Sequence, residues 1–412
     1  MSWETVKLGD CCVKIGSGAT PKGGATVYIE TGTALIRSQN VYNLAFDYQG
    51  LTYITEDAAK KLNGVTVYEK DVLLNITGDS VARVCMVPNN VLPARVNQHV
   101  AILRTNENLL PEYLLYYLAS PHMQVYMLNL AVGKGASRNA LTKGMIEDFP
   151  LLLPSVEEQK NIVKYLSAYD DLIENNQKQI KLLEEAAQRL YKEWFVDFRF
   201  PGYENTPIID GVPQGWRKSV FSDVFTFVRG KSYTSKELSE SDGVLMVNLK
   251  NIRAYGGYKR NAEKRFTGMY KEEQLLVGGD VVMGITDMTQ ERRLVGHVAL
   301  IPSFNEKVTF SMDLIKLMPY SVSKNYLYCA LQYGGYSEQI APLANGVNVL
   351  HLKPEAMMKM EMLVPDENTM QTFDVQFEAM RLKSEALEKQ CNLAVQARDR
   401  LLPKLMSGEL EV

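Results

Sequence analysis

Residues 155–198 read SVEEQKNIVKYLSAYDDLIENNQKQIKLLEEAAQRLYKEWFVDF, a stretch without proline or glycine. Apolar or tolerated residues recur along it in alternating steps of four and three, and a sustained period of 3.5 is typical of a coiled-coil seam. The seam positions are Ile162, Leu166, Tyr169, Ile173, Asn176, Ile180, Leu183, Ala187, Leu190 and Trp194. The stretch therefore predicts a long helix that needs a partner.

The chain repeats itself with a period of about 211 residues. Trp3 recurs as Trp216, and the segment 71–77 (DVLLNIT) recurs as 280–286 (DVVMGIT). Adding the period to the first seam gives a second, looser one at Phe373, Phe377, Met380, Ser384, Leu387, Cys391, Ala394, Arg398, Leu401 and Leu405. Each half is therefore predicted to contain a globular block followed by a long helix.

Two alternatives for the helices remain open. Each helix could instead pack on its own globular block, although such packing usually needs the wider apolar stripe of a 3.6 period. Asn176 could fix the helix register as a buried polar residue, or it could simply be exposed. A helix over residues 155–198 would be about 60–65 Å long, close to two turns of DNA, so a paired rod could act as a ruler.

Composition and charge describe an ordinary globular chain of more than one domain. The 412 residues are 46% hydrophobic and carry a formal net charge of −3, whereas residues 217–365 have 19 basic and 15 acidic residues, a net of +4. No apolar run approaches the ~20 residues of a membrane span, and the N-terminus has no signal-peptide pattern. Five cysteines, without a C-x-x-C pair, favour a reducing compartment. We expect a cytoplasmic protein without a membrane partner.

The order of elements predicts an α+β fold with five segments. Residues 1–154 and 217–365 are mixed α/β blocks of short strands, such as Thr33–Ile36 and Val244–Val247, each with a helix start near Pro111 or Ser323. Residues 155–200 and 366–412 are the two long helices. A linker rich in proline and glycine, 201–216, separates the halves.

The sequence holds little that points to catalysis. The histidines His99, His122, His297 and His351 are scattered, without metal-ligand spacing. Gly230-Lys231-Ser232 lacks the earlier glycine of a phosphate-binding loop, and Pro365-Asp366 has no following nuclease triplet. No segment resembles the N-P-P-[YF] motif of amino-methyltransferases. We therefore predict a non-catalytic chain with no metal or cofactor of its own.

Loops rich in groups that can bond bases and phosphates occur at equivalent places in both blocks. A single such loop is more often a solvated turn, but the recurrence strengthens a DNA-binding hypothesis. The candidate residues of the first block are Thr20, Lys22, Arg37, Gln39, Asn40, Thr77, Arg83, Asn97, Gln98, Lys134, Arg138 and Asn139. Those of the second block are Arg229, Lys231, Tyr233, Lys250, Asn251, Arg253, Lys259, Arg260, Gln290, Arg292, Arg293, Asn345 and Asn348.

Over essentially its whole length the chain resembles the specificity subunits of type I restriction-modification systems, the HsdS family. The resemblance is carried by the opening Trp3 to Asp10, by IGSGATP at 15–21, by LLLP at 151–154 leading to Glu157-Glu158-Gln159, by LYKEWFVDF at 190–198 and by RLLPKLMSGEL at 400–410. The chain departs from the pattern at Asn368-Thr369-Met370, which does not copy Glu157-Glu158-Gln159, so contacts made there should differ between the halves.

The resemblance implies two target-recognition domains that each bind one half of a split, asymmetric site in double-stranded DNA. It also implies that the two helices pair as an antiparallel coiled coil with pseudo-two-fold symmetry. Two methyltransferase subunits and two ATP-dependent restriction subunits would be the protein partners, and S-adenosylmethionine, ATP and magnesium would be bound by them. Two other functions stay open: a stand-alone DNA-binding protein or repressor, and a coiled-coil scaffold for proteins.

Overall fold

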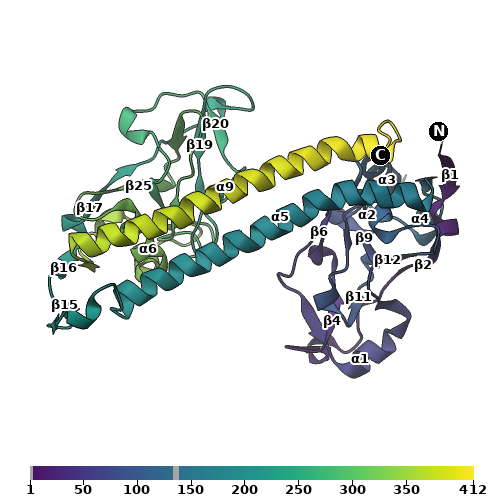
Figure 1. Cartoon of the computed structure of the whole chain (residues 1–412), viewed down its shortest axis with the longest axis horizontal. Helices are drawn as coiled ribbons and strands as arrows, with labels where there is room; N and C mark the ends of the chain where they lie inside the picture. Colours follow the sequence, from purple (N-terminus) through teal and green to yellow (C-terminus); the bar gives the residue numbers. More distant parts are fainter. Residues whose placement is uncertain (1–2, 133–138) are drawn as a thin grey trace. The chain divides into compact units, whose positions relative to one another are not determined.

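The computed structural model describes residues 3–132 and 139–412 (Figure 1). By contacts it divides into two compact units: unit 1 is Met1–Asn175 with Gln390–Val412, and unit 2 is Asn176–Lys389. Both boundaries fall inside long helices, α5 (Val156–Tyr191) and α9 (Glu367–Met406). The five segments predicted from the sequence follow chain order, whereas each unit combines one globular block with part of both helices.

Unit 1 contains two main sheets and a short pair of strands. One sheet has the order β10-β9-β12-β2, the other has the order β3-β7-β4-β11-β8, and β1 pairs with β13. The strands are β1 (Glu4–Lys7), β2 (Cys12–Ser17), β3 (Tyr28–Ile29), β4 (Thr33–Ile36), β7 (Thr52–Ile54), β8 (Thr66–Val67), β9 (Val72–Asn75), β10 (Val84–Met86), β11 (Ala94–Val96), β12 (Val100–Thr105) and β13 (Pro150–Leu153). A hairpin of β5 (Val41–Tyr42) and β6 (Ala45–Phe46) lies beside β10.

Most helices of unit 1 pack on the first of these sheets; they are α2 (Pro111–Ala119), α3 (Pro121–Ala131) and α4 (Lys143–Glu147), with α5 and the end of α9. The short helix α1 (Glu56–Lys61) packs on the second sheet, where Ala58 and Ala59 are buried with Leu35 of β4 and Ile54 of β7. Pro111 occupies the first turn of α2, where its missing N–H costs nothing. Tyr113 and Phe149 are fully buried in the core that these elements share with Ile162 and Leu166 of α5.

Unit 2 repeats this strand order. Its sheets run β17-β25-β21-β23 and β18-β20-β19-β24, and β16 pairs with β27 as β1 pairs with β13. The parallel pair β4–β11 of unit 1 has its counterpart in β19–β24. The strands are β16 (Arg217–Val220), β17 (Phe225–Arg229), β18 (Leu238–Ser239), β19 (Val244–Val247), β20 (Lys264–Phe266), β21 (Val281–Gly284), β22 (Thr286–Asp287), β23 (Val298–Leu300), β24 (Val308–Phe310), β25 (Leu314–Pro319), β26 (Leu350–His351) and β27 (Glu361–Val364).

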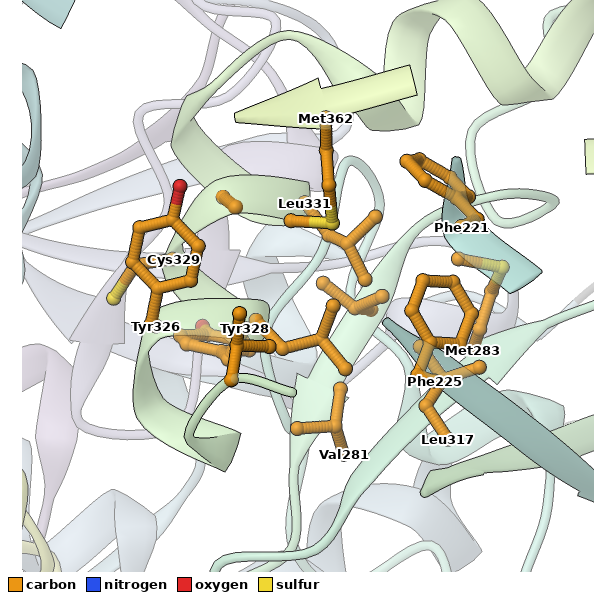
Figure 2. Close-up of a cluster of buried hydrophobic side chains, with 14 of the residues drawn as sticks. Phe221, Phe225, Val281, Met283, Leu317, Tyr326, Tyr328, Cys329, Leu331 and Met362 are labelled. Atoms are coloured by element: carbon orange, nitrogen blue, oxygen red, sulfur yellow. The ribbon is translucent and has the colours of Figure 1, made fainter. Parts of the chain in front are cut away.

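The main core of unit 2 lies between the β17-β25-β21-β23 sheet and three helices. These are α6 (Lys324–Tyr333), α7 (Tyr336–Ile340) and α8 (Pro354–Met357). Figure 2 shows Phe225, Met283 and Leu317 gathered with side chains of α6 in one hydrophobic cluster. Before β16, the linker forms the short hairpin β14 (Ile208–Ile209) and β15 (Val212–Pro213). The linker predicted at 201–216 is thus partly ordered.

Both long helices begin with side-chain caps. Ser155 Oγ accepts a hydrogen bond of 3.3 Å from Glu158 N, and Glu158 Oε2 accepts one of 2.9 Å from Ser155 N, which is a capping box. Asp366 caps α9 by accepting from Thr369 N at 3.0 Å, and it also accepts from Trp216 Nε1 at 2.9 Å. The carboxylate of the Pro365-Asp366 pair therefore has a structural role.

The helices pair antiparallel within each unit. In unit 1, Arg398 Nη1 lies 2.5 Å from Asp170 Oδ1, and the last turns of α9 run beside the first turns of α5 (Figure 1). In unit 2, the rings of Tyr191 and Phe373 are 6.4 Å apart, where α5 ends and α9 begins. The alternative in which each helix packs only on its own block is therefore wrong.

All ten seam positions predicted for the first long helix, Asn176 included, are buried or partly buried, and so are the ten of α9. The first helix ends earlier than predicted. After Tyr191 the backbone forms a π-helical turn, Lys192–Val196, and the helix does not reach Phe198, which has a positive φ of 55°. This turn directs Trp194 and Phe195 into the core of unit 2.

Gln159 connects α5 to the block of unit 1. Its buried amide accepts from Leu110 N at 2.8 Å and donates to Asn108 O at 2.9 Å and Pro154 O at 3.0 Å. Met370 is the equivalent residue of α9, and its sulfur accepts from Ser323 N at 3.3 Å. The second half thus has a methionine sulfur where the first has a glutamine amide oxygen as acceptor. In both halves the donor is a backbone N–H at the start of a helix, α2 in unit 1 and α6 in unit 2.

Candidate nucleic-acid interface

Four of the loops predicted to contact DNA in the first block contribute to the lining of one hollow of about 620 Å³, here called the unit 1 hollow. Its lining includes an amide, hydroxyls, a guanidinium, an imidazole and a carboxylate. These residues are Ser38, Gln39, Tyr42, Thr77, Gly78, Asp79, Ser80, Arg83, His99, Asn139 and Ala140. Such a mixture of donors and acceptors matches the chemistry of base edges in a DNA groove.

The β5 hairpin and the loop after β9 position the cationic side of the hollow. The Arg83 guanidinium lies over the ring of Tyr42, 4.5 Å from its centroid. Asn75 is fully buried and its amide donates to Ser38 O at 2.8 Å, which fixes the neighbouring loop. Arg83 is therefore held by a ring contact at the wall of the hollow, with its charge available to a ligand.

A chain of hydrogen bonds begins at Thr77 and His99 in the lining of the hollow. His99 Nδ1 lies 2.5 Å from Thr77 Oγ1, and its Nε2 lies 3.1 Å from Gln98 Nε2. Thr20 Oγ1 donates to Gln98 Oε1. The structure thus joins Thr20, Thr77 and Gln98, which the sequence placed in three separate loops, through a histidine that was not among the chosen candidates.

Other candidates of the first block have structural partners. Asn40 is fully buried, accepts from Arg37 N at 3.0 Å and donates to Asp47 O at 2.9 Å, so its amide closes a turn and is not available to a base. Arg37 donates from Nη2 to Gly50 O at 2.7 Å. Asn97 is buried and its Oδ1 accepts from His99 N at 3.0 Å.

The remaining candidates of the first block lie at the surface or outside the described residues. Gln39, Gln98 and Asn139 are exposed, and so are Thr20 and Lys22. Asn139 O accepts from Gly78 N at 3.0 Å, which ties the rim of the hollow together. Lys134 and Arg138 belong to the segment that the structure does not describe.

In unit 2 the equivalent turn is built in the same way. Asn251 is fully buried, accepts from Asn248 N at 2.9 Å and donates to Lys259 O at 3.0 Å, as Asn40 does in unit 1. Asn251 is therefore a structural residue and not a surface contact. The neighbouring Lys250 and Lys259 are exposed.

Three arginines that the sequence suggested for DNA take part in ion pairs within unit 2. Arg253 Nη1 lies 3.3 Å from Glu184 of α5, and Arg260 Nε lies 2.7 Å from Glu388 of α9. Arg229 Nη2 lies 2.9 Å from Glu355. The first two arginines thus attach the block to the helix pair of unit 2.

The loop after β22 is held by an acidic residue. Burial acts to raise the pKa of Asp287, but hydrogen bonds from Leu294 N, Thr289 and Val295 N outweigh it and hold the pKa below its ordinary value. Gln290 Nε2 donates to Val347 O at 2.8 Å. The loop is therefore fixed to the turn that carries Asn345 and Asn348.

The other candidates of unit 2 are arranged around these loops. Gln290, Arg293, Asn345 and Asn348 are exposed, while Arg292, Lys231 and Tyr233 are partly buried. The Tyr233 hydroxyl accepts from Lys264 Nζ at 2.6 Å. Sequence reasoning omitted Tyr42 and His99 from the chosen set because only folding brings them beside Arg83 and Thr77.

Two negative findings apply to the described residues alone. Across residues 3–132 and 139–412, no group of three or more His, Cys, Asp or Glu side chains could hold a metal ion. In the same part of the chain, no helix is long and apolar enough to cross a membrane.

Comparison with known proteins shows which proteins this chain resembles. Residues 1–185 match the model of the type I restriction modification DNA specificity domain. The whole chain is 24% identical over 424 residues to the MjaIX specificity subunit of Methanocaldococcus jannaschii, of which the match covers 94%. It is 20% identical over 480 residues to the HindI specificity subunit of Haemophilus influenzae, covering 99% of both chains.

The fold agrees with this class. The crystal structure of the type I restriction-modification S subunit from M. genitalium matches 98% of this chain and 96% of its own, with a TM-score of 0.59 and 14% identity. Residues 1–185 are thus similar to a type I DNA specificity domain. Over its full length the chain is similar to type I restriction enzyme specificity subunits.

Proposed function

We propose that this chain is the DNA-specificity subunit of a type I restriction-modification complex, in which the block of unit 1 binds one half of a split site and the block of unit 2 binds the other. The observation that carries the proposal is the repeated strand order of the two blocks, each with different polar loops, joined by paired helices. Two blocks with the same strand order but different loops would bind two half-sites of different sequence, which is what an asymmetric bipartite site requires.

The chain itself would be non-catalytic. Relatives of this kind are recognition subunits, and the groups that line the unit 1 hollow are suited to binding. We assign adenine methylation and DNA cleavage to partners: two methyltransferase subunits and two ATP-dependent restriction subunits. S-adenosylmethionine, ATP and magnesium would then be bound by those subunits. We assign their docking to the helical region.

Co-expression with a cognate methyltransferase subunit tests the proposal. The host should lack adenine methylation, and modified adenines should be mapped by single-molecule sequencing. We expect a split motif with a fixed gap, which changes in only one half when residues 217–365 are replaced by the equivalent block of a relative. Co-purification without any methylated motif, or a motif that changes in both halves, would contradict the proposal.

A further inference from the structure

Three strongly exposed apolar side chains lie on neighbouring loops of unit 2. Met288 is 77% exposed, Met312 is 52% exposed and Val347 is 89% exposed. Scattered apolar residues of this kind are normal on a protein surface. A cluster on adjacent loops is less ordinary, and these three residues are here called the apolar tip.

Hydrogen bonds show that the three loops are neighbours. Met288 directly follows β22, which pairs with β26, and Val347 belongs to the turn that precedes β26. The Gln290 side chain donates to Val347 O at 2.8 Å, so the two loops are bound to each other. Ile285 N donates to Asp313 O at 2.9 Å, which places the Met312 loop beside the same strand end.

The loops that carry the tip are held in place. Asp287 receives the hydrogen bonds described above and fixes the start of the Met288 loop. Gly346 has a φ of +153°, and a Cβ at this position would lie 1.9 Å from Val349 O, so only glycine fits the turn beside Val347. The backbone of the loops that carry the tip is therefore held in one conformation, which lowers the conformational entropy lost on binding.

Cationic residues flank the tip. Met312 N donates to Lys231 O at 2.9 Å, which places the lysine at the base of that loop. Arg292 and Arg293 follow Met288 on its own loop, with Arg293 paired to Glu291. Apolar side chains bordered by basic residues suit a DNA groove, where phosphates line the edges and the thymine 5-methyl group is the apolar feature of the floor.

We propose that Met288, Met312 and Val347 recognise thymine methyl groups in the half-site bound by unit 2. The proposal rests on the proposed function and adds a specific chemical feature to it. It also distinguishes the two units, since unit 1 presents a polar hollow where unit 2 presents an apolar tip.

Removal of the methyl groups from the DNA tests the proposal. The full chain in complex with its methyltransferase subunits is titrated with duplexes that carry the mapped site, with thymines of the unit 2 half-site replaced by deoxyuridine. Burial of one methyl group is worth about a fourfold change in affinity, so we expect a loss of about that size for each contacted thymine. The same replacement in the unit 1 half-site is the internal control.

A double variant connects the effect to the tip. M288S with V347S should bind the thymine duplex more weakly and should distinguish thymine from deoxyuridine less well than the wild type, because only Met312 of the tip remains. M269S is the matched control, because Met269 is 87% exposed in unit 2 and lies outside the tip loops. This variant should keep the full preference for thymine.

The outcomes separate the two proposals. If a bipartite motif is methylated but thymine and deoxyuridine bind equally well, or if the unit 2 half-site contains no thymine, the tip proposal is overturned and the proposed function stands. If the double variant keeps its DNA affinity but no longer co-purifies with the methyltransferase, the tip binds protein and the proposal fails. If no sequence is methylated or bound specifically, both proposals fail.

Discussion

Arg398 of α9 reaches Asp170 of α5 with a distance of 2.5 Å between Nη1 and Oδ1, and the same carboxylate accepts a hydrogen bond of 2.5 Å from the Tyr116 hydroxyl. One partly buried carboxylate thus joins both helices to α2 of the block. Because the side chains of Arg398 and Asp170 are 13% and 30% exposed, solvent screens the pair only in part. The contact fixes the helix register in unit 1.

The first prediction concerns this pair. D170A should lower the free energy of unfolding by about 1–2 kcal/mol, because Arg398 and Tyr116 lose a charged partner in a partly buried place. Urea unfolding of D170A, R398A and the double variant would measure the coupling. E157A is the control, since the exposed Glu157–Lys160 pair should contribute close to nothing. Additive effects of the two single changes would contradict the prediction.

The second prediction concerns Gln159. Q159A removes the partner of one buried N–H and two carbonyl groups, and we expect it to cost about 2–4 kcal/mol of stability. Gln188, which is exposed on the same helix, gives the matched control Q188A. The measurement is urea unfolding of the full chain. A cost of Q159A no larger than that of Q188A would show that water replaces the lost bonds.

The third prediction concerns the wall of the unit 1 hollow. R83Q removes the charge held over Tyr42 and should weaken DNA binding about tenfold, with relaxed methylation specificity in one half-site only. K60Q removes the same charge from an exposed ion pair of unit 1 and should leave specificity intact. Equal effects of the two variants would mean that Arg83 acts only through long-range charge.

The fourth prediction concerns acid stability. The pKa of Asp287 is held below its ordinary value of 3.8 in the folded chain, so the unfolded state binds the proton first as pH falls. The stabilisation is therefore present above about pH 4 and is lost as pH falls through the folded pKa. The stability difference between wild type and D287N should shrink between pH 6 and pH 3. D79N, at an exposed carboxylate, is the control, and a difference independent of pH would refute the assignment.

The fifth prediction concerns the helices as a ruler. Deleting one heptad from each helix around the contact between Ile173 and Cys391 removes about 10 Å of rise, or about three base pairs of DNA. We expect the gap of the methylated motif to shrink by that amount while both half-sites stay the same. An unchanged gap, or the loss of one half-site from the motif, would show that the helices do not set the spacing.

The helices were the part of the fold that the sequence predicted best. A period of 3.5 identifies the residues that face a partner helix. The seam positions from Ile162 to Trp194 are indeed buried or partly buried. The end of the helix was not predictable in the same way. The π-helical turn at Lys192–Val196 depends on the packing of Phe195 against Trp216 and Phe373, which are distant in sequence.

The sequence predicted which loops could form the candidate site, but not which residues in them are structural and which are free to bind DNA. Asn40 and Asn251 have the residue type that binds adenine, yet an asparagine that closes a turn has the same local sequence. Arg253 and Arg260 pair with glutamates 69 and 128 residues away, a distance over which local patterns carry no information. The apolar tip consists of two methionines and a valine, residue types that in the sequence alone look the same as core residues.

The contact made by Gln159 has a consequence for how such a protein can diversify. All three of its partners are main-chain atoms, and Met370 likewise meets a main-chain N–H. A backbone partner is present whatever side chain follows, so mutations in the surrounding block need no compensating change in the helix. The loops that determine specificity can then change by mutation, or whole blocks can be exchanged by recombination. The contact between the block and its helix is kept in either case.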